Sequence, residues 1–376
     1  MLVEPRSATD ATAPDGGFVA WVQCASSFSL FFLSWGLLSS FGSFQAYYKT
    51  DYPSWTPSQI SWIGSIQAFF LFGFSIVAGP VFDHGYLTSL VWIGCFLCVL
   101  AMMLTSISSE YWHFILAQGV MFGIGSGCLF IPSIAVLPAY FDKKQALALG
   151  VAASGSAIGG VVFPIIFNQL QPKIGFGWSI RVIGFIILLA AKIPVLGMRV
   201  RTPPSAIRKI FETPGKNHRS CGKRPCSLSS PSTQRRVFLW ANHPDHFADI
   251  YGPFNIDIIC VLLSGILAFT WISIHSTASM ILFTVSYGFF SGGLTSISPN
   301  LGVALSPDTG VLGVRLGMLL MPISVGILVG NPIAGALESY GWISLQIFTA
   351  ALLMASLLVV IIARILMYGK SLTIRC

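Results

Sequence analysis

The stretch from Tyr140 to Pro164, YFDKKQALALGVAASGSAIGGVVFP, decides the fold. A polar turn at Asp142, Lys143 and Lys144 precedes an apolar, helix-forming run that is long enough to cross a membrane. Small residues recur along this run at helical spacing: Gly150, Ser154, Gly155, Gly159 and Gly160. Because helices in lipid associate by close van der Waals contact, this pattern predicts a transmembrane helix with a packing stripe on one side. The two lysines predict that its first residues lie in the cytoplasm.

Composition extends this prediction to the whole chain. Of 376 residues, 54% are hydrophobic and 9% are charged, whereas a soluble domain carries about 25% charged residues. The chain lacks the short alternating segments of a β-barrel, so the expected class is an all-α integral membrane protein. The net charge of +8 lies in short loops, which indicates membrane topology rather than a nucleic-acid partner. His218, Cys221 and Cys226 share a basic loop but lack a suitably spaced fourth ligand, so we predict no metal and no cofactor.

Apolar segments of about 20 residues predict ten membrane spans. The first six are 18–46, 58–82, 87–107, 112–137, 145–170 and 178–198, and the last four are 254–274, 277–300, 313–337 and 342–368. This gives a tail at 1–17, a six-helix half at 18–198, a basic loop at 199–252, a four-helix half at 253–368 and a tail at 369–376. The basic loop is polar enough to predict disorder. Most Lys and Arg residues fall on one side, which predicts cytoplasmic termini in a multi-pass plasma-membrane protein.

The two halves contain similar motifs in the same order. Gly79-Pro-Val-Phe-Asp83-His-Gly85 corresponds to Phe247-Ala-Asp249-Ile-Tyr-Gly252. Gly155-x3-Gly159 with Pro164 corresponds to Gly326-x3-Gly330 with Pro332. Repeated halves related by an axis along the membrane normal are typical of one transporter architecture.

Two patterns resemble the major facilitator superfamily, in particular its fungal monocarboxylate-transporter-like branch. They are Pro14-Asp15-Gly16-Gly17-Phe18-Val19-Ala20-Trp21 and the run from Tyr140 to Gly155. Further similarities are Ser61–Ser65, Leu116–Gly119, Ile174–Trp178 with Arg181, and Gly252–Asn255. The resemblance covers about 15–200 and 237–368, and it implies a bundle of two pseudo-repeats that works by alternating access.

The chain also departs from this family in three places. The family has twelve helices, but helices 7 and 8 have no counterpart here, and residues 205–236 resemble nothing in it. The Asp/Arg pair of helix 8, which the family uses for protons and carboxylates, is therefore absent, so proton coupling is not visible in the sequence. A helix 1 lysine of animal members is replaced by Ser39, and the family's Asp-Arg-Gly turn reads Asp83-His84-Gly85.

Polar side chains inside the spans are candidates for solute binding. They are Ser39, Gln45, Gln118, Arg181 and Tyr287. Each could hydrogen-bond a solute, or equally a neighbouring helix. Arg181 could attract an anionic solute, or its side chain could extend to the outer headgroups. Asp257 and Glu338 lie near span ends, so no carboxylate is expected deep in the membrane.

Two tight turns are candidates for a gate. Asp83 with Gly85, and Asp249 with Gly252, place a carboxylate where it can cap the N-terminus of a neighbouring helix. The resemblance implies that these turns, with Lys143 and Lys144, hold the cytoplasmic side closed. The alternative is simple turn chemistry.

These observations favour a secondary transporter for a small organic solute, of which a monocarboxylate is one candidate. The alternative is a truncated, non-transporting member of the same family: a regulator, a partner of a full-length carrier, or the product of a mis-spliced reading frame. We expect no catalytic residues, because no span holds a cluster suited to catalysis or a charged ring suited to a channel. The expected partners are a small-molecule substrate and the lipid bilayer.

Overall fold

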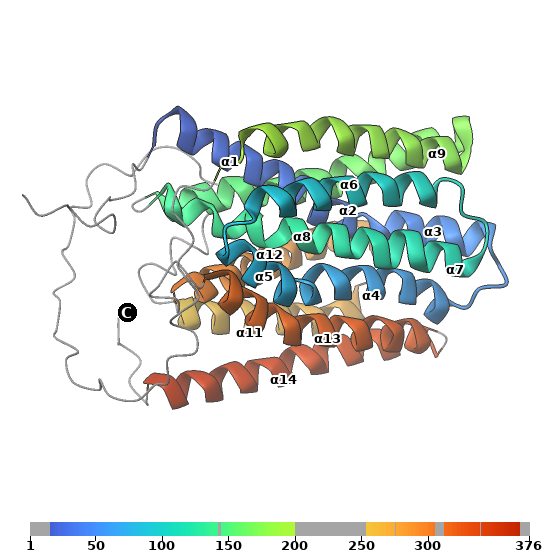
Figure 1. Ribbon diagram of the computed structural model, residues 1–376. Helices are drawn as coiled ribbons and strands as arrows, with labels where there is room; N and C mark the ends of the chain where they lie inside the picture. Colours follow the sequence, from blue (N-terminus) through green and yellow to red (C-terminus); the bar gives the residue numbers. More distant parts are fainter. Residues whose placement is uncertain are drawn as a thin grey trace, which may run out of the picture.

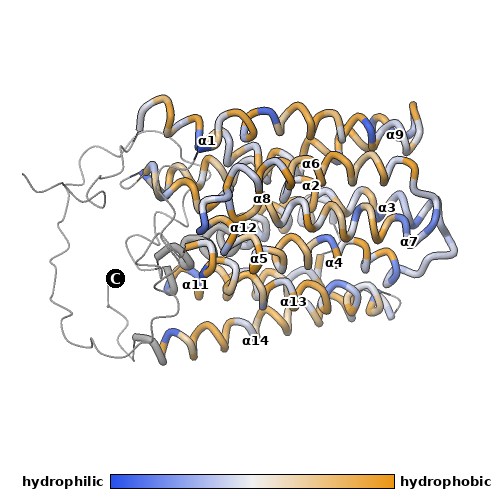
Figure 2. The backbone as a smooth tube through the Cα atoms, in the orientation of Figure 1, coloured by the Kyte–Doolittle hydropathy of each residue, from blue (hydrophilic) through white to orange (hydrophobic). Residues whose placement is uncertain are grey.

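The computed structural model describes residues 16–141, 144–199, 253–274, 276–304, 312–338 and 340–368. Within these ranges the protein is helical and contains no strand. The helices run side by side along a common direction (Figure 1). Hydrophobic residues line most of their length (Figure 2), and many apolar side chains face outward, such as Leu189 at 65% exposure. This is the surface of a bundle surrounded by lipid rather than water, and it confirms the predicted helical membrane fold.

The first part of the chain supplies most of the bundle. Its first span consists of α1 (Phe18–Phe31), the π-helical turn η1 (Phe32–Gly36), α2 (Leu37–Ser39) and α3 (Phe41–Asp51). It continues with α4 (Pro57–Gly73), α5 (Ser75–Asp83), α6 (Leu87–Thr105), α7 (Tyr111–Phe114), the π-helical turn η2 (Ile115–Met121), α8 (Phe122–Ala135), the 3-10 turn η3 (Leu137–Ala139) and α9 (Gln145–Gly197).

Helix α9 is bent at Gly175, which divides it into two membrane crossings. Gly175 has a φ of +80°, a backbone conformation that L side chains rarely adopt. The 53 residues of α9 exceed the roughly 20 needed for one crossing. The bend therefore lies between the predicted fifth and sixth spans.

The second part contains α11 (Pro253–Thr270), the 3-10 turn η5 (Trp271–Ser273), α12 (Thr277–Ala304), α13 (Leu312–Glu338) and α14 (Trp342–Tyr368). In the described ranges, eight helices are long and apolar enough to cross a membrane. One of the eight, Leu147–Gly197, contains the bend at Gly175 and covers two predicted spans. Helix α12 lies at the predicted span 277–300 and is not one of the eight, because its apolar part, Thr277–Ser291, is shorter. Helices thus lie at all ten predicted spans.

The small-residue stripe of α9 packs against the first span, as its sequence predicts. A Cβ atom at Gly159 would lie 2.7 Å from the Cα atom of Gly36, and one at Gly155 would overlap the carbonyl oxygen of Phe28. Only glycine allows these backbones to approach so closely.

Helix α13 joins the second part to the first through closely packed glycines. It packs along α4 and α5 (Figure 1). A Cβ atom at Gly317 would lie 2.5 Å from the carbonyl oxygen of Ser75, and Gly313 faces Gly79 equally closely. Gly326 and Gly330 meet nothing within 4 Å in the described ranges. In α13 the closely packed pair, Gly313 and Gly317, lies 13 residues before Gly326 and Gly330, which is about three and a half helical turns.

Candidate solute-binding site

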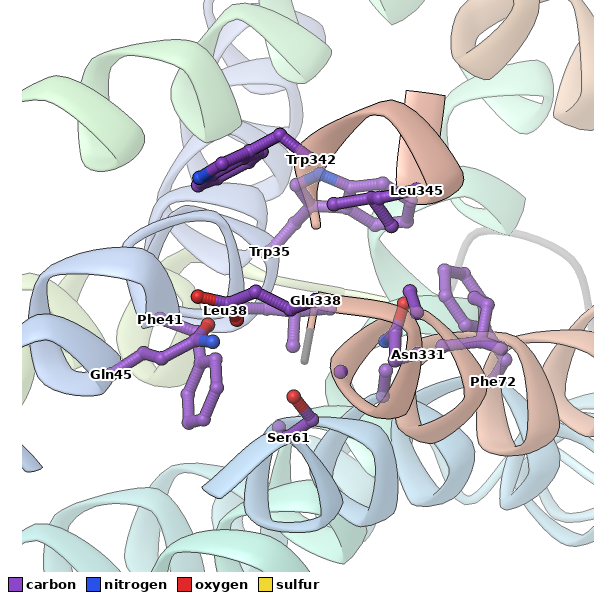
Figure 3. Close-up of a pocket in the computed structure, with 15 residues that line it drawn as sticks. Trp35, Leu38, Phe41, Gln45, Ser61, Phe72, Asn331, Glu338, Trp342 and Leu345 are labelled. Atoms are coloured by element: carbon purple, nitrogen blue, oxygen red, sulfur yellow. The ribbon is translucent and has the colours of Figure 1, made fainter. Parts of the chain in front are cut away.

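A cavity of about 550 Å³ lies between the two parts of the chain. Its walls come from η1, α2, α3 and α4 of the first part and from α13 and α14 of the second (Figure 3). The lining residues are Trp35, Leu38, Phe41, Gln45, Ser61, Gly64, Ala68, Phe72, Ile327, Asn331, Ala334, Gly335, Glu338, Trp342 and Leu345. A cavity of this size, shared by two halves of a bundle, has the dimensions of a small-molecule site.

Aromatic rings form much of the wall. Trp35 lies on η1, where the backbone leaves regular α-helical hydrogen bonding, and such π-helical turns often occur at functional sites. Its ring packs against Phe72, with 5.0 Å between ring centroids, and against Phe130, with 5.8 Å. This packing fixes the Trp35 ring as one wall of the cavity. Trp342 supplies a further ring from α14 (Figure 3).

Four polar side chains interrupt the apolar lining. They are Gln45, Ser61, Asn331 and Glu338. The Ser61 hydroxyl donates to the carbonyl oxygen of Pro57 at 2.9 Å, so its proton is already used. Glu338 is the one ionisable side chain among the lining residues that the structure describes. The cavity therefore combines aromatic surface with a small, net negative polar region.

Glu338 also connects the two parts of the chain at the end of the bundle where α3 and α13 finish, here called the Glu338 end. The Lys49 ammonium donates to its carboxylate at 2.9 Å. The Lys49 side chain is 61% exposed and that of Glu338 is 22% exposed. An ion pair that is this exposed is screened by water and contributes about 0–1 kcal/mol. It can exchange partners at low cost.

A second connection lies at the opposite end of the bundle, here called the Asp83 end. The carboxylate of Asp83 accepts hydrogen bonds from the backbone N–H groups of Gly313 and Val314, both at 2.9 Å. These amides belong to the first turn of α13, where a negative charge stabilises the helix dipole. Gly85, with a φ of +89°, provides the reversal that ends α5 and leaves Asp83 pointing at α13. The prediction that a carboxylate in this turn caps a neighbouring helix is confirmed for Asp83.

Replacing Asp83 by alanine is expected to weaken closure at the Asp83 end. Loss of a helix cap costs about 0.5–2 kcal/mol. A cost of about 1–2 kcal/mol would change the ratio of open to closed protein roughly 5- to 30-fold. The readout is the alkylation rate of a reporter Ser75→Cys, a buried site that faces α13. Asp83→Asn should give an intermediate rate, because the asparagine amide has one acceptor oxygen where the carboxylate uses two. Equal alkylation rates in the parent and the alanine variant would contradict this role.

Of the five predicted solute-binding residues, the structure places Gln45 in the cavity lining. Ser39 faces α9, where a Cβ atom at Gly160 would lie 3.2 Å from its own Cβ atom. Gln118 is 3% exposed, and its amide oxygen accepts from the Tyr48 hydroxyl at 2.5 Å. The Tyr287 ring stacks on Phe283, with 5.5 Å between ring centroids. Gln118 thus makes the helix-to-helix hydrogen bond that was the alternative to solute binding.

Arg181 lies away from the cavity, between α9 and α6. Its Nε donates to the Ser106 hydroxyl at 3.1 Å, and its guanidinium lies 4.8 Å from the centroid of the Trp178 ring. Both contacts fix the side chain to the protein, which favours a structural role over solute attraction.

Arg181→Ala is accordingly expected to lower stability without changing charge selectivity. Loss of the cation–π contact and one hydrogen bond should cost about 1–2 kcal/mol. The expected result is a thermal midpoint lower by about 2–5 °C and an unchanged ratio of anionic to neutral solute transport. A selective loss of anion transport at unchanged midpoint would instead support the solute-binding hypothesis.

The remaining candidates for a gate are covered only in part. Lys144 is exposed and immediately precedes α9. Lys143, Asp249 and Gly252 lie outside the described residues, as does the basic loop that contains His218.

Sequence reasoning missed most of the cavity wall. Trp35 was not among the predicted site residues, and Glu338 was interpreted as a residue near a span end. Asn331 and Trp342 were not considered. Asn331 and Glu338 lie seven positions apart on α13, a spacing that places both on one helix face. A search of α13 for polar residues at that spacing could have found them.

A two-part helical bundle with a cavity between its parts is typical of multi-pass membrane carriers. The family description "Major Facilitator Superfamily" matches residues 18–241. The MFS-type transporter dbaD of Emericella nidulans is 35% identical over 372 residues, covering 89% of this chain and 83% of the relative. The aspyridones efflux protein apdF of the same species is 35% identical over 387 residues, covering 94% and 79%. The fujikurins efflux protein of Gibberella fujikuroi is 30% identical over 407 residues, covering 98% and 87%. The chain belongs to the Major Facilitator Superfamily.

Proposed function

We propose that the protein is a secondary transporter that moves a small organic solute through the cavity by alternating access. The observation that carries this proposal is the position of the cavity between two parts of the chain. The contacts at Asp83 and Glu338 tie α13 to the first part on either side of that cavity. Breaking one contact while the other holds would expose the cavity to one side of the membrane at a time.

The relatives support efflux as the direction of transport. Two of them are named as efflux proteins, for aspyridones and for fujikurins. The aromatic wall of the cavity suits a solute with a large apolar surface. A monocarboxylate, the candidate suggested by the sequence resemblance, is less well supported, because the described lining holds no Lys, Arg or His.

The finer assignments belong to the same proposal. We place the chain in the fungal monocarboxylate-transporter-like branch without helices 7 and 8, with cytoplasmic termini and in the plasma membrane. Two observations support the missing helices. The described second part has four long helices, α11 to α14, and a Cβ atom at Gly326 or Gly330 would meet nothing within 4 Å among the described residues. The halves at 18–198 and 253–368 are proposed from the apolar spans. Proton coupling is left to the experiment below, because the family's helix 8 Asp/Arg pair has no counterpart here. The alternative is a truncated protein that does not transport, and it predicts no solute flux.

The test is release of solute from vesicles reconstituted with the purified protein. Vesicles are loaded with an aspyridone, a fujikurin or lactate, and release is compared with that from protein-free vesicles, with and without a pH gradient. Faster release of the aspyridone or the fujikurin supports the proposal, and acceleration by the gradient supports proton coupling. Release of lactate alone would favour the monocarboxylate. No release above the protein-free rate, from a preparation that is folded by thermal unfolding, would favour the non-transporting alternative.

A further inference from the structure

Glu338 takes part in two structures at once. It lines the cavity, and it accepts the hydrogen bond from Lys49 that joins α13 to α3. The polar ends of Glu338 and Gln45 point to the same side of the cavity (Figure 3). Gln45 and Lys49 lie four residues apart on α3, so they share one helix face. A solute held in the cavity can therefore reach the Glu338 carboxylate, which is hydrogen-bonded to Lys49.

The chemistry around Glu338 favours one kind of solute group. A carboxylate accepts hydrogen bonds and attracts cations, and it repels a second carboxylate. Trp35 and Trp342 provide aromatic faces in the same cavity, and such faces attract both flat rings and cations. Lys49 is the positive group that pairs with Glu338, and its side chain is largely exposed to solvent. A cationic group on the solute can thus replace the Lys49 ammonium, because water can solvate that ammonium once it leaves Glu338.

We propose that Glu338 selects the charge of the solute: it binds the ammonium group of an aromatic solute in exchange for Lys49. The proposal rests on the proposed transport function and names its substrate class as aromatic amines rather than carboxylates. Binding of such a solute also releases the contact between α3 and α13, which frees the Glu338 end to open.

The experiment measures binding of three probes with one ring system to the purified full-length protein by titration calorimetry. Tryptamine carries an ammonium, tryptophol is neutral and indole-3-acetate carries a carboxylate. The expected order of affinity is tryptamine, then tryptophol, then indole-3-acetate, with at least tenfold between the first and the last.

Two substitutions then separate the proposed role from a purely structural ion pair. Glu338→Gln keeps the shape of the side chain, so it should weaken tryptamine binding about tenfold and change tryptophol binding less than about threefold. Lys49→Gln removes the competitor, so it should strengthen tryptamine binding several-fold. The decisive result is that the two variants change tryptamine affinity in opposite directions. If the ion pair were only structural, either substitution would break it and both would have the same effect. Asp51→Asn is the control for general surface charge, since Asp51 is at the same end but bonds to Tyr47.

Three results would overturn the proposal. They are equal affinity for tryptamine and indole-3-acetate, the same effect of Glu338→Gln on all three probes, or no binding of any probe. None of these results bears on solute release from vesicles, so failure of this proposal and failure of the transport function are distinguishable.

Discussion

Replacing Ala334 by tryptophan is expected to reduce transport at least tenfold. Ala334 lies on α13 in the cavity lining and is only partly buried, so a large ring there would fill the space between α13 and α4. Because the ring occupies an existing cavity, the bundle need not be forced apart, and folding should be largely retained. The measurement is the rate of solute release from vesicles, with the thermal midpoint as a check on folding.

The matched control is Val329→Trp, on the same helix. Val329 is 51% exposed and is not part of the cavity lining, so the same ring would extend into lipid there. We expect a rate close to that of the parent protein. A normal rate in Ala334→Trp, with the protein shown to be intact, would mean that the solute does not pass through this cavity.

Replacing Gly155 by leucine is expected to destabilise the folded protein strongly. A Cβ atom at this position overlaps the carbonyl oxygen of Phe28 and lies 3.2 Å from the backbone nitrogen of Phe32. Backbone cannot move aside as the end of a flexible side chain can, so α1 and α9 must separate. Overpacking of this kind costs about 1–3 kcal/mol, and occasionally more. The expected thermal midpoint in detergent is lower by about 5–10 °C, with a corresponding loss of monodisperse protein.

Gly326→Leu serves as the control for this change. It introduces the same side chain in a helix, but at a glycine that meets nothing within 4 Å in the described part of the chain. Its midpoint should stay within about 1–2 °C of the parent value. If both variants lost stability equally, the effect would come from leucine in a helix and not from the contact between α1 and α9.

The sequence predicted the helices well because their signals are local. A run of about 20 apolar residues is nearly sufficient for a membrane span, and Gly155 with Gly159 marked a real packing face. The turn at Asp83 was also interpretable, because a carboxylate before a glycine in a tight turn has few chemical uses. Each of these signals is contained within a few neighbouring residues.

The cavity was much less predictable, because it depends on which helix lies beside which. Gln45 was identified through its polarity inside a span, but so were Gln118 and Arg181, whose partners are Tyr48 and Ser106. Only the three-dimensional arrangement distinguishes a polar group that faces a cavity from one that bonds a neighbouring helix. Glu338 was passed over for a related reason: a position near a span end is compatible both with solvent and with a cavity wall.

Helix α13 is held at both ends, by Asp83 at its first turn and by Lys49 at its last residue. Helix α13, which also packs along α4 and α5, can tilt away from the first part at one end only when the contact at that end breaks, and the other contact then acts as its pivot. The contacts at Asp83 and at Glu338 therefore oppose each other, and weakening either one favours opening at its own end of the bundle. A variant that weakens both should restore the original balance between the two tilted positions, while making each change of tilt faster.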